Sequence, residues 1–365
     1  MLEETASKHG VPGMAAIVVR RDAVVEDATF GIRRIGFSER IAPSDCFHIG
    51  SNTKAMTATL AAILVEKGKL AWDTKLVDVF PEWKNEIHPD YQRITLTDLL
   101  LCRAGVPEYS NFSYLFSNDP THREDGSTNH LSQDKADWRE MTSLQGSPME
   151  QRRQFALQVL RRPPAVLPET AFLYSNAGYG IAGAMMERVM NESWESLMNT
   201  YLFEPLGIRA TFDWPATDDP HQPWGHFAAK SGMQPHDPHD SYHLPACLAP
   251  AGGISMSLED FAKFLQLHLK GLEGFDGLLR AKTIKYLHTD PHDTMMNGAA
   301  FAFGWGLVNY DGKPSSWAYG SAGTFLSGAA ISPSHDLAVA VFANAGVIRA
   351  GDAGVETLQW SLRHY

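Results

Sequence analysis

The sequence predicts an α/β (α+β) fold: an antiparallel sheet built from both chain ends and flanked by helices, with an inserted, mostly helical lobe. Two observations support this prediction. Runs rich in β-branched residues, each with a short turn, occur near both ends of the chain, at residues 14–33 and 325–346. Between them lie helix-like segments such as TLTDLLLC, EQRRQFALQVLRR and SLEDFAKFLQLHLKG, separated by polar stretches. Strands, then helices, then strands indicate a sheet lobe with a helical insertion.

The chain has 365 residues, more than one hydrophobic core usually serves, so we expect one two-lobed domain over residues 1–365. The sheet lobe would comprise approximately residues 1–66 and 250–365, and the helical lobe approximately residues 67–249. The final segment, DAGVETLQWSLRHY, has an amphipathic pattern that predicts a helix packed on the sheet. Residues 110–138 are interpreted as a structureless polar insertion of the kind that often forms a lid, and a cleft between the lobes is the expected ligand site.

Composition excludes several classes of protein. The formal net charge is −11 and no cluster of five or more Lys or Arg occurs, which argues against nucleic-acid binding. Apolar runs such as LAAILV are too short to span a bilayer. The first residues have no signal-peptide pattern, so we expect a cytoplasmic protein as the sequence stands, or a periplasmic or secreted one if a leader was removed. The sequence gives no indication of oligomeric state.

Three widely spaced cysteines, Cys46, Cys102 and Cys247, form neither a disulfide framework nor a zinc pattern. Five histidines crowd one segment, at positions 221, 226, 236, 239 and 243, but a proline and the lack of a helical register argue against a metal site there. We interpret this segment as a polar wall over the cleft. No metal and no cofactor is expected.

The stretch FHIGSNTKAMTATLAAILVEK contains Ser51 and Lys54, three residues apart, before apolar residues at helical spacing. One interpretation is a helix N-cap followed by a surface cation. The other is a nucleophile with its base, because positions three apart share a helix face and the helix dipole favours an anion at this end. A second copy, Ser132 and Lys135, lies in the polar insertion and is interpreted as solvated surface.

A serine nucleophile needs a base within hydrogen-bond reach. A lysine with a lowered pKa could serve, or a tyrosine held as phenolate by a nearby cation. Tyr-Ser-Asn occurs twice, at residues 109–111 and 174–176, and the second copy precedes a glycine-rich turn into a helix. Residues 178–183 match G-x-G-x-x-G, but no strand precedes them and no acidic-tipped strand follows, so nucleotide binding is not expected. No G-x-S-x-G elbow occurs, which argues against an α/β-hydrolase.

The segments SNTK, LYSNAGYGIAGAMMERV, LFEPLGI and PAGGISMSLEDFAKF, in this order, resemble the serine β-lactamase and penicillin-binding protein family. The class C-like branch, which includes the β-lactamase-like carboxylesterases, is the most similar, and the match runs from about residue 11 to residue 346. The resemblance implies a β-lactamase/DD-peptidase-like fold, Ser51 as nucleophile, and Lys54 with Tyr174 as the proton-transfer pair. Asn176 would bind substrate and help hold Lys54. Tyr109 would line the cleft, or be an aromatic at the core edge.

The family places a Lys-Thr-Gly motif, or a variant with His or Trp, on a strand facing the nucleophile. Lys230-Ser231-Gly232 matches the residues of this motif better, but its flanking residues do not have the pattern of a strand. The segment 321–323 has the better position, directly before the C-terminal hairpin. We therefore expect Ser321 and Gly323 to contact substrate, and the backbone amides of Ser51 and Thr324 to form the oxyanion hole.

Two departures from the family pattern stand out. Ser321 occupies the position where the family usually has a cation or imidazole, and a hydroxyl is a weak partner for a substrate carboxylate. Residues 100–107, LLCRAGVP, replace a His-Thr-Ser-Gly run found in many relatives. The first departure favours an uncharged small-molecule ester or amide substrate. The prediction is a serine hydrolase that forms an acyl-enzyme on small to medium carboxylic esters. The alternatives are an acyltransferase, a D-amino-acid peptidase or β-lactamase, and a non-catalytic binding module.

Overall fold

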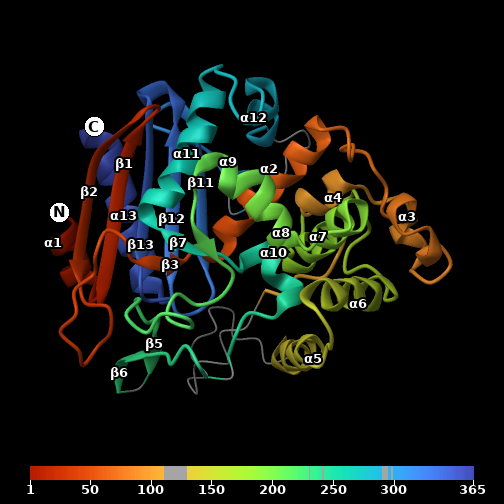
Figure 1. Cartoon of the computed structure of the whole chain (residues 1–365), viewed down its shortest axis with the longest axis horizontal. Helices are drawn as coiled ribbons and strands as arrows, with labels where there is room; N and C mark the ends of the chain where they lie inside the picture. Colours follow the sequence, from red (N-terminus) through yellow and green to blue (C-terminus); the bar gives the residue numbers. More distant parts are fainter. Residues whose placement is uncertain (111–129, 230, 241, 290–294, 297–298) are drawn as a thin grey trace.

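In the computed structural model of the chain, described for residues 1–110, 130–229, 231–240, 242–289, 295–296 and 299–365, one large antiparallel sheet lies beside a helical region (Figure 1). The sheet order is β2-β1-β13-β12-β11-β10-β9-β8. The strands are β1 (Gly13–Arg20), β2 (Ala23–Gly31), β8 (Met295–Met296), β9 (Ala299–Ala302), β10 (Trp305–Tyr310), β11 (Lys313–Ser321), β12 (Leu326–Ser332) and β13 (Leu337–Ala343). Because β1 pairs with β13, strands from the two chain ends lie side by side near the β2 edge of the sheet, and the prediction of a sheet built from both ends is confirmed.

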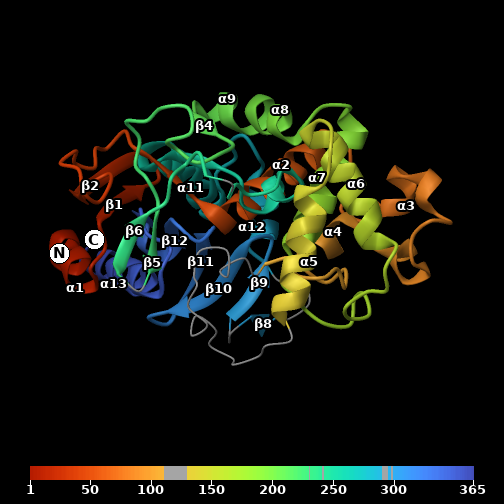
Figure 2. The same ribbon diagram turned by 90° about the horizontal axis from the view of Figure 1, so that it is seen from below.

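Helices cover both faces of this sheet (Figure 2). Side chains alternate between the faces along each strand. In β1, Ala15, Ile17 and Val19 belong to the core shared with α11 (Leu258–Leu272). Met14, Ala16 and Val18 belong to a second core, shared with α1 (Leu2–His9) and α13 (Ile348–His364). The predicted C-terminal helix is thus present and begins earlier, at Ile348.

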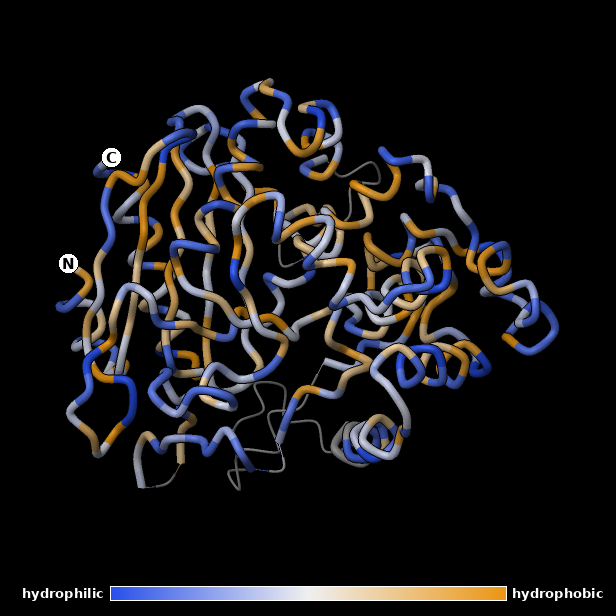
Figure 3. The backbone as a smooth tube through the Cα atoms, in the orientation of Figure 1, coloured by the Kyte–Doolittle hydropathy of each residue, from blue (hydrophilic) through white to orange (hydrophobic). Residues whose placement is uncertain are grey.

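The remaining helices form the region beside the sheet, with α2 between the two parts (Figure 1). They are α2 (Thr53–Glu66), α3 (Leu76–Val79), α4 (Leu96–Leu100), α5 (His130–Thr142), α6 (Pro148–Leu160), α7 (Asn176–Met190), α8 (Trp194–Met198), α9 (Glu204–Leu206), α10 (Ala249–Gly252) and α12 (Ala281–Leu287). Helix α2 is buried around nearly its whole circumference, as expected of a helix with apolar or small residues on every side. Hydrophobic segments gather along the inner strands and helices, and hydrophilic ones lie at the periphery (Figure 3).

Short elements join the two parts. Strand β7 (Ser255–Ser257) pairs with β3 (Cys46–His48) and with β4 (Ala210–Thr211), while β5 (His226–Ala229) and β6 (Gly232–Pro235) form a separate hairpin. The single-turn helices include η1 (Gly50–Asn52), η2 (Pro81–Trp83), η3 (Pro89–Arg93), η5 (Asn199–Phe203), η6 (Ala246–Leu248) and η7 (Pro333–His335). None of the helices in the described ranges is long and apolar enough to cross a membrane.

The predicted structureless insertion at residues 110–138 is wrong in its second part, where α5 begins at His130. Residues 111–129, including Asn111 of the first Tyr-Ser-Asn copy, lie outside the described residues. Helix α5 is polar on most of its surface, so the spacing of apolar residues did not predict it. Trp138 and Met141, one turn apart, are the anchors: Met141 is buried, and the ring of Trp138 stacks on that of Tyr242 at 5.3 Å.

Candidate active site

Ser51 lies in η1, the single turn that leads from β3 into α2. The residues at the N-terminal ends of η1 and α2 are Ile49 and Asn52, and neither end has a side-chain cap. Ser51 therefore does not cap the helix. Its hydroxyl instead lies 3.0 Å from Nζ of Lys54 on the first turn of α2.

The ammonium site of Lys54 is buried, with 1% of the residue exposed. Nζ contacts three oxygens: Ser51 Oγ at 3.0 Å, Asn176 Oδ1 at 2.6 Å and the carbonyl oxygen of Ala251 at 2.9 Å. A carbonyl oxygen can only accept, so the two N–H groups of a neutral amine are used by Asn176 and Ala251. The nitrogen lone pair then points to the hydroxyl of Ser51.

Burial also lowers the pKa of Lys54 to about 7, because the charged form loses its hydration. No carboxylate contributes to this shift. A substantial fraction of Lys54 is therefore neutral near pH 7, and that form can accept the proton of Ser51.

Tyr174 contacts both members of the pair. Its phenol interacts with the Ser51 side chain, and its ring centroid lies 4.7 Å from Nζ of Lys54. Burial raises the pKa of Tyr174 above its ordinary value, and the interaction with Ser51 opposes this only in part. Of the two bases left open by the sequence, the structure thus favours lysine, with Tyr174 present as a neutral phenol that can donate a proton.

Backbone contacts from the segment 102–109 hold Tyr174 and Asn176 in place. Leu173 N donates to the carbonyl of Cys102 at 2.8 Å, and Asn176 N donates to the carbonyl of Glu108 at 2.8 Å. Ser175 caps α7 by accepting from Gly178 N. The segment LLCRAGVP, whose consequence the sequence left open, therefore provides, together with Glu108, the backbone against which the Tyr-x-Asn segment docks.

Tyr109 contributes through its backbone rather than its ring. Its carbonyl accepts from Nδ2 of Asn176 at 2.9 Å, which orients the Asn176 oxygen toward Lys54. The ring packs edge-on against Phe155 at 5.0 Å, and Arg162 donates to its hydroxyl. The core-edge alternative describes this side chain better than the cleft-lining one.

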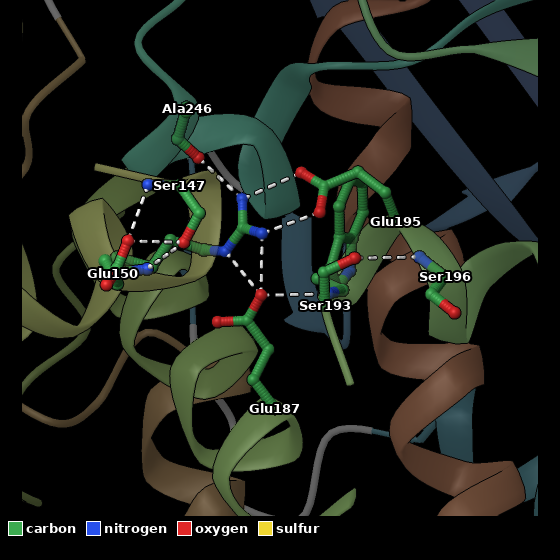
Figure 4. A network of polar contacts seen from close by, with 9 residues as sticks. Ser147, Glu150, Glu187, Ser193, Glu195, Ser196 and Ala246 are labelled. Carbon is green, nitrogen blue, oxygen red and sulfur yellow. Dashed lines mark hydrogen bonds and ion pairs between the residues drawn. The ribbon is translucent and has the colours of Figure 1, made fainter. Parts of the chain in front are cut away.

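The carbonyl of Ala251 was not predicted from the sequence. It lies in α10, which follows η6, and a buried ion-pair network holds this segment (Figure 4). Arg152 binds the carboxylates of Glu187 and Glu195, and its Nη1 donates to the carbonyl of Ala246 at 2.8 Å. The sequence marked this region only through the segment PAGGISMS, which contains Ala251 and is part of the family resemblance.

The strand facing Ser51 is β11, and the contact is made by Gly320. A methyl group on Gly320 would lie 2.0 Å from the carbonyl oxygen of Ile49 and 2.6 Å from the amide of Ser51. A methyl group on Gly50, which has φ +48°, would lie 2.5 Å from the amide of Ser321. Both positions therefore need glycine, and the two backbones meet at Ser51 and Ser321.

The expected role of Thr324 in the oxyanion hole is wrong for this structure. Thr324 is fully buried, its carbonyl accepts from His226 N, and it packs against Gly225 and Gly346. It belongs to the turn between β11 and β12, beyond the strand end that meets Ser51. A substrate oxygen cannot reach a fully buried amide without rearrangement.

The segment 321–323 was predicted to be the third motif, the equivalent of the family's Lys-Thr-Gly. Its polar side chain also makes its hydrogen bonds within that turn. Ser321 Oγ donates to the carbonyl of Phe325 at 2.7 Å and accepts from Gly323 N at 3.1 Å. Gly323 lies against Gly346. For the other candidate segment, Lys230 lies outside the described residues, and Gly232 is in the β5–β6 hairpin.

The remaining sequence features have structural explanations. Gly180 and Gly183 of the G-x-G-x-x-G match lie inside α7 and allow it to pack closely on Cys247 and Pro250. His226 is buried against the carbonyl of Asn344, and His243 pairs with Asp213. Lys135, of the second Ser-x-x-Lys copy, is exposed on α5. Within the described ranges, no group of three His, Cys, Asp or Glu residues is arranged to hold a metal ion.

The chain is similar to known proteins over nearly its whole length. The family model described as Beta-lactamase matches residues 1–359. Penicillin-binding protein 4 of Amycolatopsis lactamdurans is 24% identical over 347 residues, which cover 93% of this chain and 83% of that protein.

Two solved structures share the fold. The octameric penicillin-binding protein homologue from Pyrococcus abyssi matches with a TM-score of 0.76 and 23% identity, covering 99% of this chain and 75% of that one. A class C beta lactamase from Rhodobacter sphaeroides matches with a TM-score of 0.67 and 19% identity, covering 98% and 97%.

Proposed function

The chain belongs to the beta-lactamase family of serine hydrolases, and from this premise we propose that it cleaves small to medium carboxylic esters through an acyl-enzyme on Ser51. The observation that supports this most strongly is the contact of a buried lysine, with a pKa of about 7, on the hydroxyl of Ser51. A base with a pKa near the working pH combines availability with proton affinity.

In the proposed acylation, neutral Lys54 accepts the proton of Ser51 while Oγ attacks the ester carbonyl. The Asn176 and Ala251 oxygens hold the lysine so that its lone pair faces Oγ. Tyr174 then donates its phenolic proton to the leaving alkoxide and regains one from Lys54. Water attacks the acyl-enzyme by the same transfers in reverse order, and the carboxylic acid is released.

The negative charge on the carbonyl oxygen would be stabilised by two backbone amides, those of Ser51 and Ser321. This assignment uses Ser321 in place of Thr324, and it follows from the contact of Gly320 and Ser321 with the turn that contains Ser51. One donor of this kind contributes roughly 3–4 kcal/mol to transition-state stabilisation.

The absence of a cation at the position of the family's motif lysine on the facing strand supports a neutral substrate. Once Gly320 is taken as the glycine of the third motif, Ala318 stands two residues earlier, on the same face of β11, where the family has its cation or imidazole. Ala318 has no charge to bind a substrate carboxylate. Esters without a free carboxylate therefore fit this site better than β-lactams or D-peptide ends, which have one.

The test is turnover of p-nitrophenyl acetate and butyrate by the wild type and by Ser51→Ala. We expect the variant to lose roughly 10³-fold or more in kcat, because removing the nucleophile leaves only binding and oxyanion stabilisation. An acyl adduct of the intact protein should map to the peptide that contains Ser51. An unchanged rate in the variant would refute the assignment.

The alternatives give different results in the same preparation. Transfer of the acyl group to an added alcohol or amine would indicate an acyltransferase. Turnover of nitrocefin or of D-amino-acid amides would indicate a β-lactamase or peptidase, the activity suggested by the names of the similar proteins. Failure of a fluorophosphonate probe to label Ser51 would indicate a non-catalytic binding module.

A further inference from the structure

Four side chains form a continuous hydrogen-bonded chain beside the candidate site; we call Ser316, His288, His268 and Thr59 the histidine chain. Ser316 Oγ lies 2.6 Å from Nδ1 of His288, and Nε2 of His288 lies 2.8 Å from Nδ1 of His268. Nε2 of His268 lies 3.1 Å from Oγ1 of Thr59. Thr59 Oγ1 in turn donates to the carbonyl of Ala55 at 2.8 Å.

The bonds of the histidine chain favour one direction. Because the Thr59 hydroxyl donates to Ala55, its oxygen must accept from Nε2–H of His268. Nδ1 of His268 then accepts from Nε2–H of His288, and Nδ1 of His288 accepts the Ser316 proton. The opposite direction would place the Thr59 and Ala55 oxygens 2.8 Å apart with no proton between them. Both imidazoles are thus neutral Nε2–H tautomers.

The two ends of the histidine chain lie on the two elements that form the catalytic geometry. Thr59 is on α2, which also holds Lys54, and its acceptor Ala55 is the residue after that lysine. Ser316 is on β11, on the same strand face as Gly320, which contacts the Ser51 turn. His268 comes from α11, and His288 directly follows α12. The bonds therefore join α2 to β11 at a second point, away from Ser51.

We propose that the histidine chain is a set of positioning residues that fixes the nucleophile helix against the strand supplying the Ser321 amide. This inference rests on the proposed function, because it assigns a consequence to the distance between those two elements. The four residues touch no substrate; they act through α2 and β11. A displacement of about 1 Å between catalytic groups can cost on the order of a hundredfold in rate.

The same arrangement makes the chain sensitive to acid. Protonating His288 places a proton on its Nδ1, so Ser316 must change from donor to acceptor. Protonating His268 requires the same change at Ser316 and a change of tautomer at His288, so the direction of the bonds is lost in both cases. Within the described part of the molecule, the rings packed on the pair, Phe264 and Trp305, are uncharged. The only titratable group there that acts on His268 is His288, and none acts on His288. Burial lowers the pKa of both, that of His288 to about 3.

The kinetic test compares Ser316→Ala and Thr59→Val with Ser315→Ala. Ser315 is a matched control, since it is equally buried on β11 but bonds to Ser332 on the opposite strand face. We expect kcat for a p-nitrophenyl ester to fall about tenfold to a hundredfold in the first two variants with KM within about threefold, and to change less than twofold in the control. A purely structural role predicts lower melting temperatures with kcat kept at 25 °C, and that result would overturn the proposal.

A second readout is independent of activity. In protein labelled with ¹⁵N-histidine, His268 and His288 should both give Nε2–H tautomer signals that persist at pH 5, and Ser316→Ala should shift those of His288. Nδ1–H tautomers would contradict the chain. If the wild type neither hydrolyses esters nor reacts with a fluorophosphonate, the proposed function fails and the positioning role fails with it. If it is active and both variants match the control, only the positioning role fails.

Discussion

Replacing Gly320 with alanine tests the geometry of the candidate site most directly. The added methyl group would lie 2.0 Å from the Ile49 carbonyl oxygen and 2.6 Å from the Ser51 amide, whereas ordinary contacts of this kind are 3.4 Å or longer. All the nearest atoms are backbone, so no flexible side chain can move aside. The end of β11 must therefore shift by more than about 1 Å from the serine turn, which takes the Ser321 amide out of oxyanion geometry.

The expected effect is a loss of about 10²–10³-fold in kcat, the range for removing one oxyanion donor. The assay is p-nitrophenyl butyrate hydrolysis, with thermal unfolding measured on the same samples. Gly306→Ala on the neighbouring strand is the matched control, since its methyl group would meet its nearest atom at an ordinary 3.4 Å. If Gly320→Ala keeps kcat within about threefold of the wild type, Gly320 does not contact Ser51 as described, and the oxyanion amide must come from elsewhere.

Three further outcomes are expected. The value of kcat/KM for a neutral ester should rise with pH and level off above about pH 7, because Lys54, with a pKa of about 7, must lose its proton to act as base; a flat profile from pH 5 to 9 would exclude it. Tyr174→Phe should lower kcat by roughly 10²–10⁴-fold with little change in KM, since it removes a general acid but no binding surface; wild-type kcat would show that the phenol transfers no proton. Arg152→Met should lower the free energy of unfolding in urea by about 3–5 kcal/mol, because Glu187 and Glu195 lose their cation; a change below about 1 kcal/mol would contradict the importance of this network.

The parts of the fold that follow from local patterns could be predicted from the sequence. Strands at both ends show as β-branched runs, and α2 shows as helical apolar spacing. The Ser51–Lys54 contact spans only three residues on one turn, so spacing alone suggests it. Helix α5 could not be predicted in this way, since its few anchoring side chains gain their partners only in the folded chain.

Contacts made by backbone atoms across long separations could not be predicted either. The carbonyl of Ala251 binds Lys54 across 197 positions, and the carbonyls of Cys102, Glu108 and Tyr109 hold the Tyr174 segment. Every residue type has a backbone carbonyl, so residue identity does not show which carbonyls make these contacts. Their positions depend on how α10 and the segment 102–109 pack in the folded chain, which local sequence patterns do not determine.

For the third motif, sequence spacing and backbone sterics select different glycines. Residues 320–324, Gly-Ser-Ala-Gly-Thr, contain two glycines three positions apart, and spacing from the C-terminal hairpin favours Gly323. The contact with Ile49 and Ser51 leaves no room for a side chain at Gly320, and this requirement identifies it as the motif glycine. With Gly320 instead of Gly323 as the motif glycine, Ala318 replaces Ser321 at the cation position. Ser321 in turn replaces Thr324 as the donor of the oxyanion amide. Because neither Ser321 nor Ala318 is charged, the preference for a neutral ester does not depend on the register, whereas the oxyanion assignment depends on it entirely.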